Sequence, residues 1–192
     1  MERSGEGELV KLADGMWQGR EVYLVGSGPS AAGWRAPPGE LVVAAGRAGL
    51  VLDPPPSLWV SLDSVFWRKV GTVARPGCAR VWIDTGDLRP EVEVVLPCAA
   101  PRSAGTPGNV LAWGRSLAEG VGGGGNSGYS ALNLADVLGA SRVYLVGFDG
   151  PEPPVLERWL AAWSFALEAA RPDVVVVGES RLPRGRTSWS SS

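Results

Sequence analysis

Residues 26–31, with the sequence GSGPSA, are of the types that bring a protein backbone close to a phosphate group. They follow an apolar run and match the Gly-x-Gly-x-x-Ala pattern of dinucleotide-binding turns, in which Gly26 and Gly28 would let the chain turn sharply. Only about one helical turn fits before Pro37, whereas a crossover helix usually needs ~10 residues. An NADP- or flavin-dependent oxidoreductase is therefore disfavoured, although Arg47 could meet a 2′-phosphate. A strand-terminal turn without a ligand is the alternative.

A second glycine-rich segment, residues 122–129 (GGGGNSGY), leads into a predicted helix. Asn126 is a typical helix N-cap, and the free N–H groups of a helix start bind anions. Ser127 adds a hydroxyl group, and Gly128 would let a ligand lie against the backbone. A mobile loop is the alternative. We favour ligand binding, because two such sites on one parallel sheet could hold the two ends of a nucleotide.

Three aspartates follow apolar runs, namely Asp63, Asp84 and Asp149. Carboxylates at such positions could bind a metal ion, hold a ribose or act as a base. The alternative for each one alone is a helix cap.

Nine tryptophans are present. Some of them could line a pocket or stack on a base, with core packing as the alternative; the candidates are Trp34, Trp59, Trp67, Trp82 and Trp113.

Composition excludes several classes of chemistry. The sequence has no histidine, which rules out Ser-His-Asp and Cys-His catalysis and His-ligated metal sites. Cys78 and Cys98 lack the spacing of a metal site. The formal charge of −2 provides no broad basic field, so nonspecific binding to nucleic acid is not expected. No apolar run reaches the ~20 residues of a membrane helix, and the charged N-terminus lacks a signal core, so we expect a cytoplasmic protein without a membrane partner.

Seven short apolar runs predict β-strands. They lie at residues 21–26, 41–45, 58–62, 80–84, 92–96, 143–147 and 174–178. Most are apolar throughout, which is typical of a parallel sheet covered on both faces. Helices are predicted over 126–138 and 155–170, with short ones near 6–16 and 63–70, and a loop over 97–125. We therefore expect an α/β protein with a mostly parallel, Rossmann-like sheet and helices on both faces. Residues 1–183 would form a single nucleotide-binding domain, and residues 184–192 a disordered tail.

These motifs occur in an order that resembles a known family. The order is VGSGPS at 25–30, LDS at 62–64, GNSGYSALNLA at 125–135 and GASRVYLVGFD at 139–149. It resembles phage and prophage proteins of the MptE-like family, which is related to 6-hydroxymethylpterin diphosphokinase and distantly similar to bacterial sialyltransferases that use CMP-sugars. The resemblance covers about residues 20–180, and 125–149 is its most specific part.

The resemblance implies a nucleotide bound between the two glycine-rich segments. Gly28, Pro29 and Ser30 would then lie at the phosphates. The residues Asn126, Ser127 and Gly128 would meet phosphate or ribose. Asp63 and Asp149 match acidic, catalytic positions of the family, and Asp149 could bind Mg²⁺.

The resemblance predicts a transferase that moves a glycosyl or diphosphoryl group from a nucleotide or nucleotide-sugar donor, located in the host cytoplasm if phage-encoded. The chain departs from the family in two places: Gly46-Arg47 replaces an Asn-Asp pair, and a His-rich loop after Asp149 is missing. The alternative is therefore a non-catalytic nucleotide-binding or interaction module derived from such a transferase. The sequence does not identify the base, the acceptor or the oligomeric state.

Overall fold

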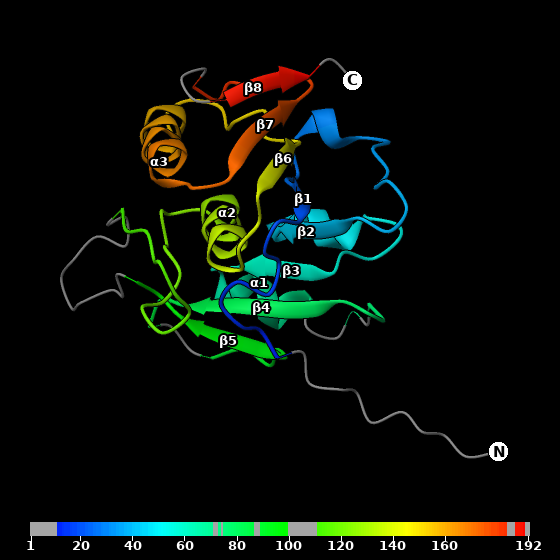
Figure 1. Ribbon diagram of the computed structural model, residues 1–192, viewed down its shortest axis with the longest axis vertical. Helices are drawn as coiled ribbons and strands as arrows, with labels where there is room; N and C mark the ends of the chain where they lie inside the picture. Colours follow the sequence, from blue (N-terminus) through cyan, green and yellow to red (C-terminus); the bar gives the residue numbers. More distant parts are fainter. Residues whose placement is uncertain are drawn as a thin grey trace.

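The computed structural model of the protein describes residues 11–70, 73, 75–86, 89–99, 111–183 and 187–190. These residues form an eight-stranded sheet with the strand order β5-β4-β3-β2-β1-β6-β7-β8 (Figure 1). Every pair of neighbouring strands is parallel. The strands are β1 (Glu21–Val25), β2 (Leu41–Ala45), β3 (Leu58–Ser61), β4 (Ala79–Asp84), β5 (Val94–Pro97), β6 (Arg142–Val146), β7 (Asp173–Val177) and β8 (Thr187–Ser190). The predicted α/β class and the seven predicted strands are confirmed.

Helices cover both faces of the sheet, as predicted. On one face, α2 (Ser127–Val137) and α3 (Leu156–Ala169) pack against apolar side chains of the central strands. On the other face, Trp67 of α1 (Ser64–Val70) packs with Trp59 and Trp82. Burial on both sides explains why the strands are apolar throughout rather than alternating.

Strand β1 is the point at which the order of strands in the sheet reverses. Strands β2 to β5 extend to one side of it, and β6 to β8 extend to the other. The connections that leave the carboxyl ends of β1 and β6 therefore diverge, and open α/β sheets bind ligands in the crevice that this creates. Between β1 and β2 the chain forms only one 3₁₀ turn, η1 (Pro29–Ala31), as the short spacing before the prolines predicted.

Polar side chains of α2 hold two stretches of backbone that precede the helix, residues 112–114 and the beginning of the glycine-rich segment. The Asn133 amide oxygen accepts hydrogen bonds from the backbone N–H groups of Gly114 (2.9 Å) and Gly122 (2.7 Å). The Ser130 hydroxyl donates to the Gly122 carbonyl at 2.7 Å, and the Tyr129 hydroxyl donates to a backbone carbonyl at 2.8 Å. Burial raises the pKa of Tyr129, so this hydroxyl stays protonated and serves as a structural donor. The predicted loop over 97–125 contains no helix in its described parts, 97–99 and 111–125.

Two expectations about the ends of the chain need correction. Residues 187–190, expected in a disordered tail, form β8 and pair with β7 in parallel register, Val174 opposite Thr187. The edge of β7 offers unpaired backbone groups, which bind a short strand even where its sequence lacks an apolar pattern. Residues 11–16 of the helix expected near 6–16 form coil and turns, and residues 6–10 lie outside the described part. The remaining tail residues, 184–186 and 191–192, also lie outside it.

Candidate functional site

A cavity of about 520 Å³ opens at the carboxyl ends of the central strands. It is formed by the segments that follow β1, β2 and β6, together with the beginnings of α2 and α3. The lining residues are Gly26, Ser27, Gly28, Pro29, Ala45, Gly46, Arg47, Gly124, Gly125, Asn126, Ser127, Gly128, Gly147, Phe148, Gly150, Pro151, Val155, Arg158 and Trp159. The structure thus brings the two glycine-rich segments together in one cavity. Of the predicted binding residues, Ser30 alone does not line it.

The glycines after β1 are required by packing against the segment after β6. A Cβ atom at Gly26 would lie 2.5 Å from the carbonyl oxygen of Gly147. One at Gly28 would lie 2.7 Å from the same oxygen and would overlap the Asp149 carboxylate. Gly147 has a φ of +74°, a conformation that favours glycine. The Gly-x-Gly pattern is therefore explained by contact between two loops, without reference to a ligand.

Most amide groups of this first turn are already hydrogen bonded within the protein. Gly26 N–H donates to the Val146 carbonyl at 2.8 Å, and Gly28 N–H donates to the Gly147 carbonyl at 2.9 Å. Ser30 N–H donates to Asp149 Oδ2 at 3.1 Å. Because Pro29 has no N–H, only the Ser27 amide lacks an acceptor among the described residues of this turn. The first turn thus offers a phosphate far fewer donors than its sequence pattern predicts.

The beginning of α2 retains free donors. Asn126 caps the helix as predicted, since its Oδ1 accepts the Tyr129 N–H at 2.8 Å. The N–H groups of Ser127 and Gly128 have no acceptor in the described structure. The Ser127 hydroxyl lies 3.3 Å from Ser61 Oγ, which ties α2 to the end of β3. Two free amides and the positive end of an 11-residue helix therefore border the cavity.

Gly128 has a packing role that the sequence did not indicate, in addition to its place on the cavity wall. The residue is buried, and a Cβ atom there would lie 2.5 Å from Phe148 Cε1 and 3.2 Å from Trp163 Cζ2. The missing side chain therefore makes room for two aromatic rings beneath the helix start. Replacing Gly128 with a larger residue would disturb the core as well as the cavity, so such a variant does not isolate ligand binding.

All three aspartates accept hydrogen bonds from backbone N–H groups, Asp63 and Asp84 from nearby residues and Asp149 from the turn after β1. Asp63 Oδ1 accepts the N–H groups of Val65 (2.8 Å) and Phe66 (3.0 Å) at the start of α1, which is a helix cap. The Asp84 carboxylate accepts the Gly86 N–H at 2.8 Å. Asp149 accepts the Ser30 N–H, and none of the three lines the cavity. Among the described residues, no cluster of three or more acidic or cysteine side chains could hold a metal ion.

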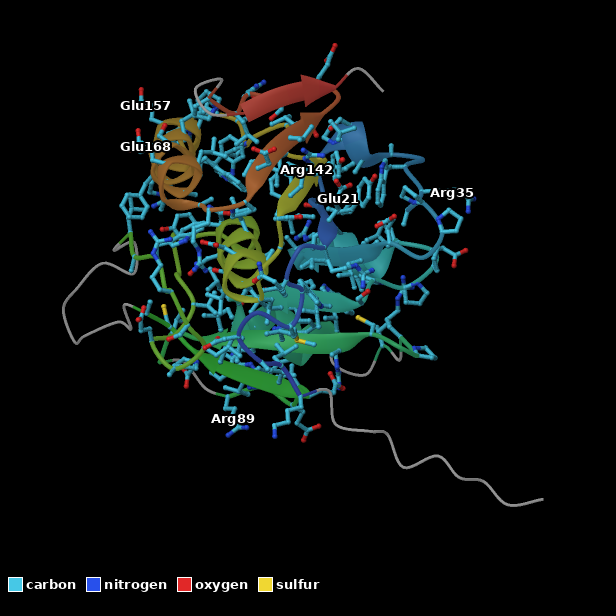
Figure 2. The ribbon with its side chains drawn as sticks, viewed as in Figure 1. Glu21, Arg35, Arg89, Arg142, Glu157 and Glu168 are labelled. Atoms are coloured by element: carbon cyan, nitrogen blue, oxygen red, sulfur yellow. The ribbon has the colours of Figure 1, made fainter. Side chains whose placement is uncertain are left out.

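Two arginines give the cavity its charge. Arg47, at the end of β2, lines it as the sequence suggested, and Arg158 from the first turn of α3 also lines it. Neither forms a salt bridge within the described ranges. Figure 2 shows Glu157 and Glu168 on the outer side of α3. No acidic residue occurs among the described residues that line the cavity, so it presents positive charge and backbone donors.

Arg158 and Trp159 are among the lining residues that were not expected from the sequence. The five tryptophans considered as pocket or stacking candidates do not line the cavity, and three of them are fully buried: Trp59, Trp67 and Trp82. A usable signal was present, because α3 begins soon after β6, and its first turn must lie at the carboxyl edge of the sheet.

Within the described residues, no helix is both long and apolar enough to span a membrane.

The cavity is thus a phosphate-compatible crevice in a parallel α/β sheet. Comparisons with family models, with curated proteins and with solved structures gave no match to this chain.

Proposed function

We propose that the protein binds a nucleotide or nucleotide-sugar in the cavity between β1, β6 and α2. The observation that carries this proposal is the combination of free Ser127 and Gly128 amides with Arg47 and Arg158 around one cavity at the strand reversal. Helix-start amides and guanidinium groups are the donors that proteins use for phosphate. The phosphate would lie at the α2 start, with the Ser27 amide as a further donor from the first turn.

Between the two activities predicted for such a ligand, the cavity favours binding over transfer. A glycosyl or diphosphoryl transferase needs a group that accepts a proton from the acceptor substrate. The predicted catalytic carboxylates, Asp63 and Asp149, are bonded to backbone amides and do not line the cavity. A nucleotide-binding module related to such transferases is therefore our first proposal. Transfer is the second, supported by the two arginines, which could stabilise charge on a leaving phosphate.

The predicted Mg²⁺ does not fit a site built by the described side chains. One carboxylate oxygen of Asp149 is hydrogen bonded to the Ser30 N–H, Asp149 does not line the cavity, and no acidic side chain occurs among the described residues that do. Mg²⁺ that arrives bound to the ligand's phosphates remains a prediction. Membership of the MptE-like family, a phage origin and a cytoplasmic location likewise remain predictions.

A ligand panel tests the proposal. Isothermal titration calorimetry with CMP, UDP, ATP, NADP and FAD, each with Mg²⁺ and with EDTA, should show micromolar binding of at least one mononucleotide. NADP and FAD should not bind specifically, because the single turn after β1 leaves a pyrophosphate few free amides. A copurifying yellow chromophore or a micromolar NADP affinity would favour the oxidoreductase alternative.

Charge variants locate the site. Arg47→Gln and Arg158→Gln should each weaken nucleotide binding about tenfold, as expected for loss of one charge-assisted contact worth about 1.5 kcal/mol. Arg35→Gln is the matched control, because this exposed arginine lies on the loop after η1 and does not line the cavity (Figure 2). If all three variants bind the nucleotide as tightly as the unmodified protein does, the ligand lies elsewhere. If the unmodified protein binds no nucleotide, the proposal is refuted.

A further inference from the structure

The cavity has a side of a different chemical character from the α2 start. Residues 147–159 contribute Phe148, Pro151, Val155 and Trp159, together with one charged side chain, Arg158. This side of the cavity is therefore mainly apolar and aromatic, whereas the α2 start is polar. A ligand that matches both sides must join a phosphate to a flat apolar group. The volume of about 520 Å³ lies within the range of about 300–1,000 Å³ typical of small-molecule sites.

The Trp159 side chain packs against other residues on the side away from the cavity. It lies in the first turn of α3, is half-buried, and packs on Trp163 with ring centroids 5.8 Å apart. Trp163 is fully buried and packs edge-to-face on Phe148 at 5.0 Å. The six-membered ring of Trp159 also lies beside Gly150, 3.4 Å from where a Cβ atom would be. The indole is therefore a supported surface, so binding a ligand to it costs little side-chain entropy.

Resting on the proposed function, we infer that Trp159 is the stacking surface for the ligand's base. The ligand class is then nucleotides, as opposed to sugar phosphates or inorganic phosphates, which the α2 start alone could bind. Stacking on an aromatic ring accepts any base, because every base has a π face. Besides Trp159, the Arg158 guanidinium is the one hydrogen-bonding side chain among the described residues on this side of the cavity, and it can only donate. We therefore expect weak discrimination among bases.

A matched pair of ligands separates the base from the phosphate. CMP and ribose 5-phosphate share the sugar and the phosphate and differ in the base. The unmodified protein should bind CMP at least tenfold more tightly than ribose 5-phosphate, measured by calorimetry. Trp159→Ala should weaken CMP binding about tenfold and leave the affinity for ribose 5-phosphate within about twofold, as expected for loss of stacking. Trp159→Phe, which keeps a ring, should retain most of the CMP affinity.

A second aromatic residue of the same helix provides the control. Phe165 is 36 % exposed, stacks near Tyr129 and does not line the cavity, so Phe165→Ala should leave CMP binding unchanged. Circular dichroism confirms the fold of each variant. If the unmodified protein binds neither ligand, the proposed function fails. If it binds both equally, or if Trp159→Ala weakens both equally, phosphate binding stands and the stacking role is refuted.

Discussion

At the scale of single residues, the contacts of a side chain decide its role more than its place in a motif does. Asp149 follows β6 at the edge where a ligand is expected, yet its Oδ2 accepts the Ser30 N–H. It also fills the space that a Cβ atom at Gly28 would need. The carboxylate therefore links the loop after β6 to the turn after β1. This contact joins residues 119 positions apart, so no local pattern could reveal it.

Variants of Asp149 distinguish a linking role from a catalytic or metal-binding one. Asp149→Asn keeps an oxygen that can accept the Ser30 N–H, so CMP affinity should stay within about tenfold, or ~1.4 kcal/mol. Asp149→Ala removes that acceptor and should lower the free energy of unfolding by about 1–2 kcal/mol in urea titrations. If Asp149→Asn abolishes CMP binding while the fold is intact, the negative charge itself acts on the ligand, and the linking role is insufficient.

The raised pKa of the Cys78 thiol predicts that the free energy of unfolding depends on pH in alkaline solution. Burial, followed by the negative charge of Glu93, raises the pKa of this thiol from its ordinary value of 9.0 to about 11. The unfolded chain loses the thiol proton before the folded chain does, so the folded state is favoured fully below pH 9, and this contribution is lost as the pH rises toward 11.

The Cys78 contribution can be isolated by substitution. Between pH 8 and pH 10 the free energy of unfolding should fall by about 1 kcal/mol more in the unmodified protein than in Cys78→Ala, measured by urea titration. Tyrosines and lysines also titrate in this pH range, but they contribute equally to the change in both proteins, so their contribution cancels in the difference. An identical pH dependence in both proteins would show that the thiol does not titrate differently on folding.

At the scale of elements, apolar patterns predicted strands β1 to β7 and helices α1 to α3 but missed β8, and they predicted a helix where residues 11–16 form coil and turns. The polar contacts of α2 were not predictable. The Asn126 cap is encoded locally, by a capping residue just before a helical pattern. Asn133 and Asp136 look like ordinary surface residues of an amphipathic helix, yet both are buried. Asp136 accepts the Trp113 indole N–H at 2.7 Å and pairs with Arg171 at 2.6 Å. These partners come from segments distant in sequence, which a helical period does not describe.

The role of Asn133 in holding the glycine-rich segment predicts a large effect on stability. Asn133→Leu keeps a similar volume but leaves the buried N–H groups of Gly114 and Gly122 without their acceptor. The free energy of unfolding should fall by about 2–4 kcal/mol in urea titrations. Asn126→Ala, which removes a helix cap and a long hydrogen bond to the Gly124 carbonyl, is the comparison and should cost about 1 kcal/mol. A smaller loss in Asn133→Leu than in Asn126→Ala would contradict this account.

At the scale of the whole molecule, the strand order places the candidate site and also leaves two edges. The site lies where the order reverses beside β1, which the sequence suggested through the glycine-rich turn and the later GNSGY motif. The outermost strands are β5 and β8. Without β8, the edge of the sheet would be β7, whose central residues Val174, Val175 and Val176 are buried. An exposed apolar edge strand is a template for pairing with another chain.

Truncation tests whether β8 protects this edge. A chain that ends at residue 183 loses the β7–β8 pairing, so its free energy of unfolding should fall by about 1–3 kcal/mol. It should also self-associate, seen as larger species in light scattering, because the β7 backbone groups lose their partner. A chain that ends at residue 190 keeps β8 and is the matched control. If both chains unfold at the same urea concentration and stay equally monodisperse, β8 adds nothing to the sheet, and β7 is a sufficient edge on its own.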